Sequence, residues 1–192
     1  MRDLSGDPAA MSALAHPVRL ALLELLGRDG PLTATAAGER LGQSPGNMSW
    51  HLRILARHHF VVEAEGGIGR RRPWMLTASG QRLDPEQGSE EERAAADALL
   101  STVVERTFGQ LRAWLASRRA APSSWQRAAA VSQWTLYLTP AETAQVRDTI
   151  YQLLAQFGDR VEDPSRRPEG AMPVNAFVSM HPQALPPDKA QP

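Results

Sequence analysis

The chain has 192 residues, of which 42% are hydrophobic, and it carries 21 basic and 21 acidic side chains. It lacks cysteine, which excludes disulfides and thiolate metal sites, and no apolar run approaches the about 20 residues that a membrane-spanning helix needs. No signal peptide opens the sequence. We therefore expect a soluble, cytoplasmic protein without a membrane partner.

The neutral total hides a small difference between two parts of the chain. Residues 1–80 carry nine arginines against seven carboxylates, a net charge of +2, and the remainder carries twelve basic against fourteen acidic residues, a net charge of −2. The difference identifies no partner by itself. The basic residues of the first part nevertheless concentrate on one predicted helix and on the hairpin after it.

The first segment combines an arm and an apolar helix. Residues 1–9 are polar and contain glycine and proline, a composition typical of a flexible arm. An apolar helix begins at about Pro8 or His16 and ends at the Asp29-Gly30-Pro31 breaker. Its leucines form a broad face, so we expect this helix to be largely buried.

Two further helices follow, separated by a short turn. Thr33 suits the N-cap of a helix that closes near Gly42, and Gly38 within it indicates a close helix crossing. Pro45 then occupies the first turn of a third helix. At 100° per residue, Met48, Leu52, Leu55 and His59 share one side of this helix, Gly46, Trp50, Arg53 and Arg57 lie roughly opposite, and Asn47 and Ser49 lie on the flanks.

A β-hairpin is predicted directly after the third helix. A strand begins at Phe60, residues 65–69 form a glycine-rich turn, and a second strand returns from Arg70 to Leu76. Trp74 and Leu76 share the face that can cover a core, whereas Arg70, Arg71 and Arg72 lie near the exposed tip.

The polar face of the third helix and the arginine hairpin suit DNA better than plain solvated surface. Arg53 can pair with guanine and Asn47 with adenine, while Ser44 and Ser49 suit phosphate oxygens. The guanidiniums of Arg70, Arg71 and Arg72, with Arg57 on the helix, can bind phosphates or enter a narrow minor groove. Trp50 can pack on sugar or a thymine methyl, or it can cover the helix bundle.

These residues carry a family resemblance over about residues 10–80. The segments His16-Pro17-Val18-Arg19-Leu20, Leu41-Gly42, Ser49-Trp50-His51-Leu52-Arg53 and Phe60-Val61, with the hairpin closing at Leu76-Thr77, resemble the winged helix-turn-helix of ArsR-type bacterial transcriptional regulators. The resemblance implies a homodimer that binds a palindromic operator in double-stranded DNA, usually represses, and releases DNA when an effector binds. Because this chain has no cysteine, a thiolate metal sensor is excluded and the implied effector is a non-metal small molecule.

A long helix is predicted after the hairpin. Ser89 and Glu92 form a capping box, three glutamates suit the first turn, and an apolar stripe continues to Arg118-Arg119 and Pro122. A stripe this long needs a partner helix, which in this kind of regulator is commonly the same helix of a second subunit. The predicted dimer residues are Leu99, Leu100, Val103, Val104, Leu111 and Trp114.

The last part predicts a small β-α-β module. Apolar residues alternate in 131–138 and 173–180, and a helix capped by Thr139 and Glu142 lies between them. Trp114, Trp134, Tyr137 and Phe157 can line a pocket for an apolar or aromatic effector, or they can be ordinary core residues. The predicted fold is α+β and mainly α: an arm (1–9), a winged helix-turn-helix domain (10–82), a dimerisation helix (89–120), the β-α-β module (121–182) and a disordered tail (183–192).

Other chemistries find little support. His51 borders the core stripe and is expected to be structural, and adjacent His58 and His59 point in different directions, so we predict no metal site and no cofactor. None of the hydrolase, phosphate-loop or dinucleotide motifs occurs, so we predict no enzyme. The alternative to a DNA-binding regulator is a winged-helix module for protein–protein interaction without specific DNA binding.

Overall fold

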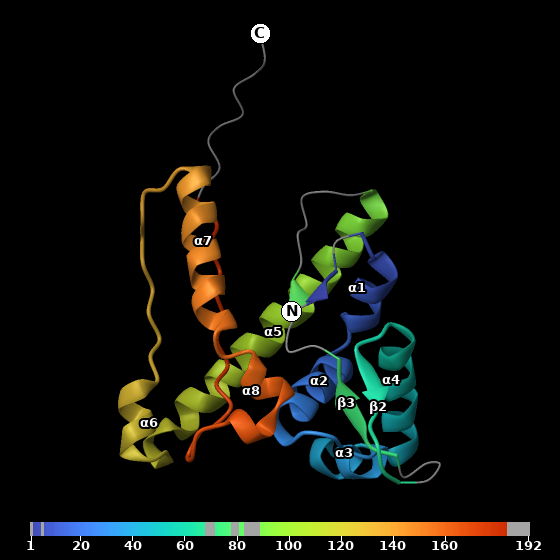
Figure 1. The fold of residues 1–192 in the computed structure, drawn as a ribbon. Coiled ribbons are helices and arrows are strands. Elements are labelled where there is room, and N and C mark those ends of the chain that lie inside the picture. The colour runs from blue at the N-terminus through green and yellow to red at the C-terminus, as the bar shows by residue number, and fades with distance from the viewer. Residues whose placement is uncertain (1, 5, 68–71, 78–80, 83–88, 184–192) are drawn as a thin grey trace.

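The computed structural model describes residues 2–4, 6–67, 72–77, 81–82 and 89–183. The winged part of the chain consists of four helices and a hairpin, packed together at the right of Figure 1. Its elements are α1 (Pro8–Leu14), α2 (Pro17–Asp29), α3 (Ala34–Leu41), α4 (Pro45–Arg57), β2 (Val61–Glu63) and β3 (Trp74–Leu76). A long helix, α5 (Glu90–Ser117), runs from this part toward the rest of the chain.

The helix starts follow the local chemistry that the sequence predicts. The hydroxyl of Thr33 accepts a hydrogen bond from the amide of Ala36 at the start of α3, and Gly42 ends that helix in the left-handed region at φ 64°. Gly38 makes a close approach, although to the turn before α4, because a Cβ there would lie 2.6 Å from the carbonyl oxygen of Gln43. This packing sets the position of α4.

The hairpin packs its inner face on the helices. Strands β2 and β3 are antiparallel, with Val61 opposite Leu76, and Leu32 exchanges backbone hydrogen bonds of 3.0 and 2.8 Å with Trp74. Trp74 and Leu76 pack against the core, as the alternation predicts. Strand β3 is therefore held on both sides, by β2 and by the segment after α2.

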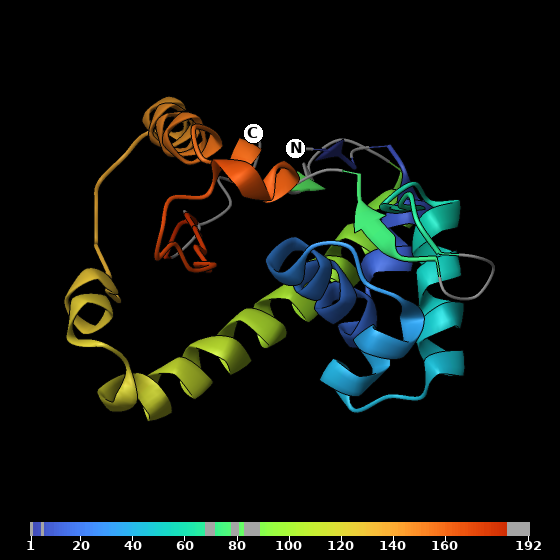
Figure 2. The same cartoon turned by 60° about the horizontal axis from the view of Figure 1, so that its bottom comes forward.

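One apolar core joins the winged part to the first turns of α5. Figure 2 shows α5 passing behind α1 and α2, and Ala95, Ala96 and Leu99 are buried in the same cluster as the apolar residues of those helices. The N-terminal arm is also part of this packing, which makes the prediction of a flexible arm wrong. Leu4 is 0% exposed, and β1 (Arg2–Asp3) pairs in parallel with β4 (Gln81–Arg82). A single apolar residue in a polar segment gave no periodic signal of this burial.

Helix α5 has two different halves. Ser89 and Glu92 form the predicted capping box, and its 28 residues extend about 42 Å at 1.5 Å per residue. In its first half, Ala95, Ala96 and Leu99 on one side are buried, whereas Val104, Phe108 and Leu115 farther along are exposed. The helix ends in the 3-10 turn η2 (Arg118–Ala120) before Pro122, close to the predicted end.

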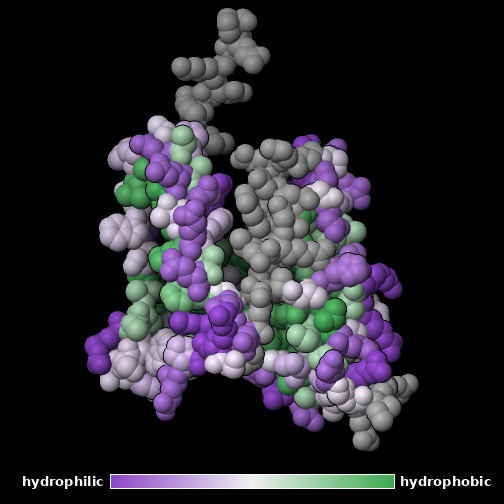
Figure 3. All heavy atoms as spheres, viewed as in Figure 1, coloured by the Kyte–Doolittle hydropathy of each residue, from purple (hydrophilic) through white to green (hydrophobic). Residues whose placement is uncertain are grey.

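The C-terminal part is helical but has little core of its own. It contains α6 (Ser123–Ala128), α7 (Pro140–Ala155), α8 (Asp159–Glu162) and the 3-10 turn η3 (Pro164–Arg166). Thr139 and Glu142 form the predicted capping box of α7. In the space-filling view, apolar residues reach the surface along α7 and the segment beside it, at the left of Figure 3.

The two strands of the predicted β-α-β module are absent from the described residues. Segments 131–138 and 173–180 are both extended but form no ladder. Alternation makes a strand only where a neighbouring strand accepts its backbone hydrogen bonds, and no ladder joins these two segments in the part of the chain that the structure describes. The α+β class with a winged helix and a long helix is otherwise as predicted.

Helices α1 and α2 are bent by 83° at their junction and are the one helix pair that passes a length and composition test for a membrane span. Among the described residues, no single helix passes this test. The apolar side chains of both helices belong to the core cluster. Most of the predicted disordered tail, residues 184–192, lies outside the described residues.

Candidate nucleic-acid interface

Helix α4 has one buried face and one polar face, as predicted. Met48, Leu52 and Leu55 are each fully buried in the core, which fixes the rotation of the helix about its axis. Trp50, at 54% exposure, projects from the opposite side together with exposed Arg53 and Arg57. The predicted grouping therefore holds for these residues. His59 is different, because the helix ends at Arg57 and His59 is exposed with a φ of 57°.

The start of α4 brings the predicted polar residues together. The hydroxyl of Ser44 caps the helix by accepting a hydrogen bond from the amide of Asn47, at 3.2 Å. The side-chain amide of Asn47 donates to the carbonyl oxygen of the Gln43 side chain, at 3.0 Å. Ser44 is exposed and Ser49 half-buried. Because the Ser44 oxygen already accepts one bond, its own hydroxyl proton remains for an outside acceptor such as a phosphate.

A buried cluster of basic side chains lies directly beneath Trp50. His51 is 3% exposed, and its ring centroid lies 4.7 Å from those of both His16 and Trp50. Burial lowers the pKa of His51, and the neighbouring charges of His16 and Arg19 lower it further. The pKa of His16 is lowered by burial and by Arg19. These shifts favour the neutral imidazoles, and the ring of Trp50 meets that of His51 edge to face, with 72° between the ring planes.

This cluster was only partly foreseen from the sequence. The structural role of His51 was predicted, but its contact with His16 joins α4 to the start of α2, residues that are far apart in the chain. Arg19 donates to the carbonyl oxygen of Ala13, and its Nε, like Nδ1 of His51, is buried without a hydrogen-bond partner in the described structure. The sequence contained one sign of this contact, because the polar residues His16 and Arg19 occur at the start of an otherwise apolar helix. The described residues contain no group of three or more metal-ligating side chains.

The structure describes only one of the three hairpin arginines. Arg70 and Arg71 lie outside the described residues. Arg72 is exposed and pairs with Glu63 of the adjacent strand at 2.9 Å, so its charge is shared before any DNA arrives. An exposed pair of this kind contributes at most about 1 kcal/mol, and exchanging Glu63 for a phosphate costs little.

The four predicted effector-pocket residues do not share a pocket in the single chain, contrary to expectation. Tyr137 is 98% exposed and Trp134 is also exposed. Phe157 is exposed and carries the guanidinium of Arg160 4.9 Å from its ring centroid. Trp114 lines a separate concavity at the end of α5. The residues share a type but come from segments that do not pack on each other.

The predicted dimer residues also separate into two groups. Leu99 is 1% exposed and Val103 packs against the same core, so Leu99 cannot belong to a dimer interface as predicted. Leu100, Leu111 and Trp114 are half-buried, and Val104 is exposed. A helical stripe does not reveal whether its partner is the same chain or another, and here the first turns of the stripe are covered by α1 and α2.

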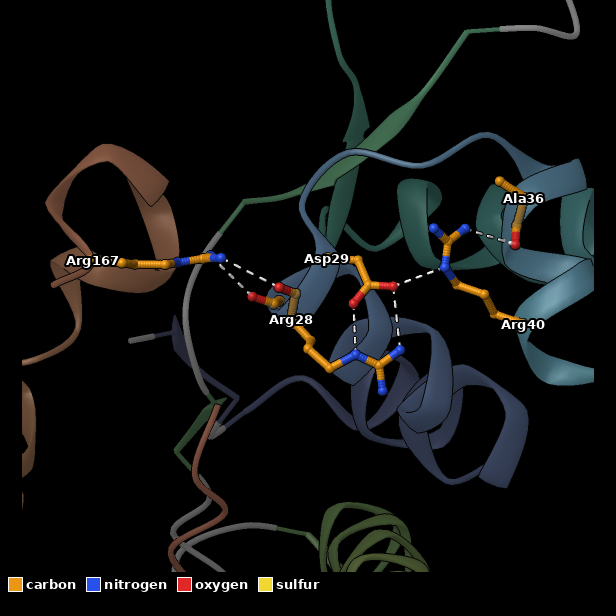
Figure 4. A network of polar contacts seen from close by, with 6 residues as sticks. Arg28, Asp29, Ala36, Arg40 and Arg167 are labelled. Carbon is orange, nitrogen blue, oxygen red and sulfur yellow. Dashed lines mark hydrogen bonds and ion pairs between the residues drawn. The ribbon is translucent and has the colours of Figure 1, made fainter. Parts of the chain in front are cut away.

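Helix α2 is tied to its surroundings by arginines. Figure 4 shows Asp29 between two guanidiniums, with Nε of Arg28 at 2.6 Å and Nε of Arg40 at 2.9 Å. The hydrogen bond from Arg28 is the main cause of the lowered pKa of Asp29. From the opposite side, Arg167 donates to the carbonyl oxygens of Gly27 and Arg28, each at 3.3 Å. These contacts connect the C-terminal part to the winged part.

A match to a family model supports the assignment of the domain. Residues 14–64, which span α2 to β2, match a family described as a helix-turn-helix domain. A solved structure of a MarR family regulator from Neisseria meningitidis resembles the chain with 16% sequence identity and a TM-score of 0.34, covering 72% of this chain and 78% of that one. No curated protein matches the sequence. With its hairpin and two-faced α4, the chain has a winged helix-turn-helix domain of the kind found in DNA-binding transcriptional regulators.

Proposed function

We propose that this protein is a sequence-specific transcriptional regulator of the ArsR type, acting as a homodimeric repressor on a palindromic operator. The observation that carries the proposal is the geometry of α4, whose apolar side is buried to completion while Trp50, Arg53 and Arg57 face outward. A helix held in this way by its own domain can enter the major groove without rearrangement. The residues of its polar face lie outside the core.

The residues divide into those that read bases and those that position the protein. Arg53 and Asn47 suit base edges in the major groove, and Trp50 suits a sugar or a thymine methyl. Ser44, Ser49 and Arg57 suit the phosphates that flank the groove. The arginines of the hairpin, Arg70 to Arg72, suit the adjacent backbone or minor groove. One copy of this face contacts one half-site, so specificity requires two copies.

The dimer is supported by the part of α5 that leaves the core. Val104, Phe108 and Leu115 are apolar and exposed on this helix, and apolar residues of α7 are exposed as well. Apolar surface of this extent on one chain is typical of an interface. The interface that we propose therefore excludes Leu99 and begins near Val104. Two domains joined in this way bind half-sites about one helical turn apart.

DNA binding is tested in two steps. Genome-wide mapping of binding sites identifies the operator, and fluorescence anisotropy on that operator then measures affinity at several salt concentrations. Arg53→Ala should weaken specific binding by about 1–3 kcal/mol and relax sequence preference at one position. Arg71→Ala should weaken binding to all sequences alike and reduce the salt slope by about 1, because one phosphate contact is lost.

Arg112→Ala is the matched control. Arg112 is an exposed arginine on α5, away from α4 and the hairpin, and its loss should leave affinity unchanged. Equal affinity of all three variants and the wild type, with an unchanged salt slope, would contradict the proposal. Sedimentation of the complex adds the stoichiometry, for which we expect two chains per operator.

The alternative function is a protein-interaction module without specific DNA binding. It is favoured by one observation, the exposed apolar residues of the C-terminal part, together with a net charge of zero. Under this alternative, mapping finds no operator, and substitutions on the polar face of α4 have no effect. A chain that binds DNA only weakly and without salt dependence would favour it over the regulator.

A further inference from the structure

A concavity lies at the far end of α5, remote from α4. It has a volume of about 240 Å³ and lies between the end of α5, α6 and the start of the extended segment that follows α6. Its walls include Trp114, Leu115, Arg118, Arg119, Gln126 and Val131. The lining thus combines aromatic and aliphatic residues with two arginines that are adjacent in the sequence.

Hydrogen bonds from one side chain to backbone carbonyl oxygens fix the shape of this concavity. The side-chain amide of Gln126 on α6 donates to the carbonyl oxygen of Ala121 at 2.7 Å and to that of Arg119 at 3.3 Å. These bonds hold α6 against the 3-10 turn that ends α5, where free carbonyls would otherwise face solvent. The two walls are therefore held at a set angle in the absence of any ligand.

The charge around the concavity is unbalanced. Residues 106–141 contain five arginines and no acidic residue, in a chain whose net charge is zero. Arg106 is paired with Glu24 at 2.5 Å. Arg118 and Arg119 have neither an ion pair nor a side-chain hydrogen bond to any described residue. The carbonyl end of α5 stabilises cations there, which accounts for the position of both arginines but supplies no anion to either.

From this arrangement we propose that the concavity is a binding site for a small organic anion, with an aromatic or aliphatic body and a carboxylate or phosphate head. The indole of Trp114 and the side chains of Leu115 and Val131 cover the body. Arg118 and Arg119 bind the head, because a guanidinium offers paired donors that match the oxygens of either group. The volume limits the body to about the size of a single ring.

This site deepens the proposed function, since it is the place at which an effector would bind, but it is tested without DNA. Tryptophan fluorescence and calorimetry on the full chain measure binding of phenylacetate and of phenyl phosphate, which separate the two head groups. Phenylacetamide is the neutral analogue of the same shape. We expect at least one anion to bind saturably and to bind about tenfold more tightly than phenylacetamide, because the amide lacks the charge.

Two variants assign binding to the site. The double variant Arg118→Gln with Arg119→Gln should weaken the anion about tenfold or more and leave phenylacetamide unaffected. Arg127→Gln, an exposed arginine of α6 outside the concavity, is the matched control and should bind as the wild type does. Circular dichroism of each variant verifies that the helices persist.

Each outcome decides the proposal. Absence of binding by both anions, equal binding of phenylacetamide, or wild-type affinity in the double variant would overturn it. Saturable binding that depends on Arg118 and Arg119 supports it even if the chain proves to bind no operator, in which case only the regulator function fails.

Discussion

The winged part and the C-terminal part of this chain both contain many apolar residues, but they differ in how far those residues are buried. In the winged part, the apolar residues of α1, α2 and α4 meet in one cluster and are almost completely buried. From the middle of α5 onward, apolar and aromatic side chains such as Trp134, Tyr137 and Leu153 are exposed in the single chain. The winged part therefore has a core of its own, whereas the C-terminal part leaves much of its apolar surface uncovered in one chain.

The largest expected difference between the two parts is the effect of removing a leucine. Leu55→Ala in α4 should destabilise the protein by about 2–5 kcal/mol, because Leu55 is 0% exposed and a cavity would remain. Leu153→Ala in α7 should change stability by less than about 0.5 kcal/mol, because Leu153 is 56% exposed. Urea unfolding at low protein concentration measures both values. A cost at Leu153 that grows with concentration would instead place α7 in a dimer interface.

Replacing one glycine in each part by alanine should change the stability of the protein in opposite directions. Gly38→Ala should destabilise the protein by about 1–3 kcal/mol, because the new Cβ would lie 2.6 Å from the carbonyl oxygen of Gln43. Gly109→Ala in α5 meets nothing within 4 Å and should stabilise by about 0.5–1 kcal/mol, since alanine favours a helix. Thermal and urea midpoints report both. Destabilisation by Gly109→Ala would mean that something in solution packs against this side of α5.

The smallest expected effect is the share of the pH dependence of stability that arises from two histidines of the winged part. The pKa values of His16 and His51 are lowered by burial, so the unfolded chain binds protons more readily than the folded one. Stability should therefore be complete above about pH 6.5, the unfolded value, and should decrease as the pH falls below it. His51→Gln should reduce the dependence of the free energy of unfolding on pH, even if the substitution itself changes the stability of the protein. An unchanged slope in the His51→Gln variant would contradict the assignment.

Features that depend on neighbouring residues in the sequence were predicted well. The capping boxes at Ser89 and Thr139, the ends of α3, and the buried and polar sides of α4 all follow from interactions within a few residues. Such interactions can be recognised from spacing alone. The same holds for the inward face of the hairpin at Trp74 and Leu76, which alternation determines.

Features that depend on distant partners were predicted poorly. The alternation in 131–138 did not show that a second strand would be missing, and the stripe of α5 did not show that Leu99 would pack within its own chain. Leu4 lies in the core because of contacts that no local pattern records. Among the candidate site residues, the α4 face was therefore predictable, whereas the pocket and interface residues required the packing to be known.

The length of α5 gives the molecule a mechanical property. One side of the first half of this helix is fixed in the winged core, and Arg106 near its middle pairs with Glu24, whereas the concavity lies at its far end. From Arg106 to Ser117 the axis extends about 17 Å at 1.5 Å per residue. A tilt of about 5° about Arg106 would therefore move the far end by about 1.5 Å. In the dimer that we propose, a ligand that displaces the far end would rotate the winged domain by a few degrees and alter the angle at which the two α4 helices meet their half-sites.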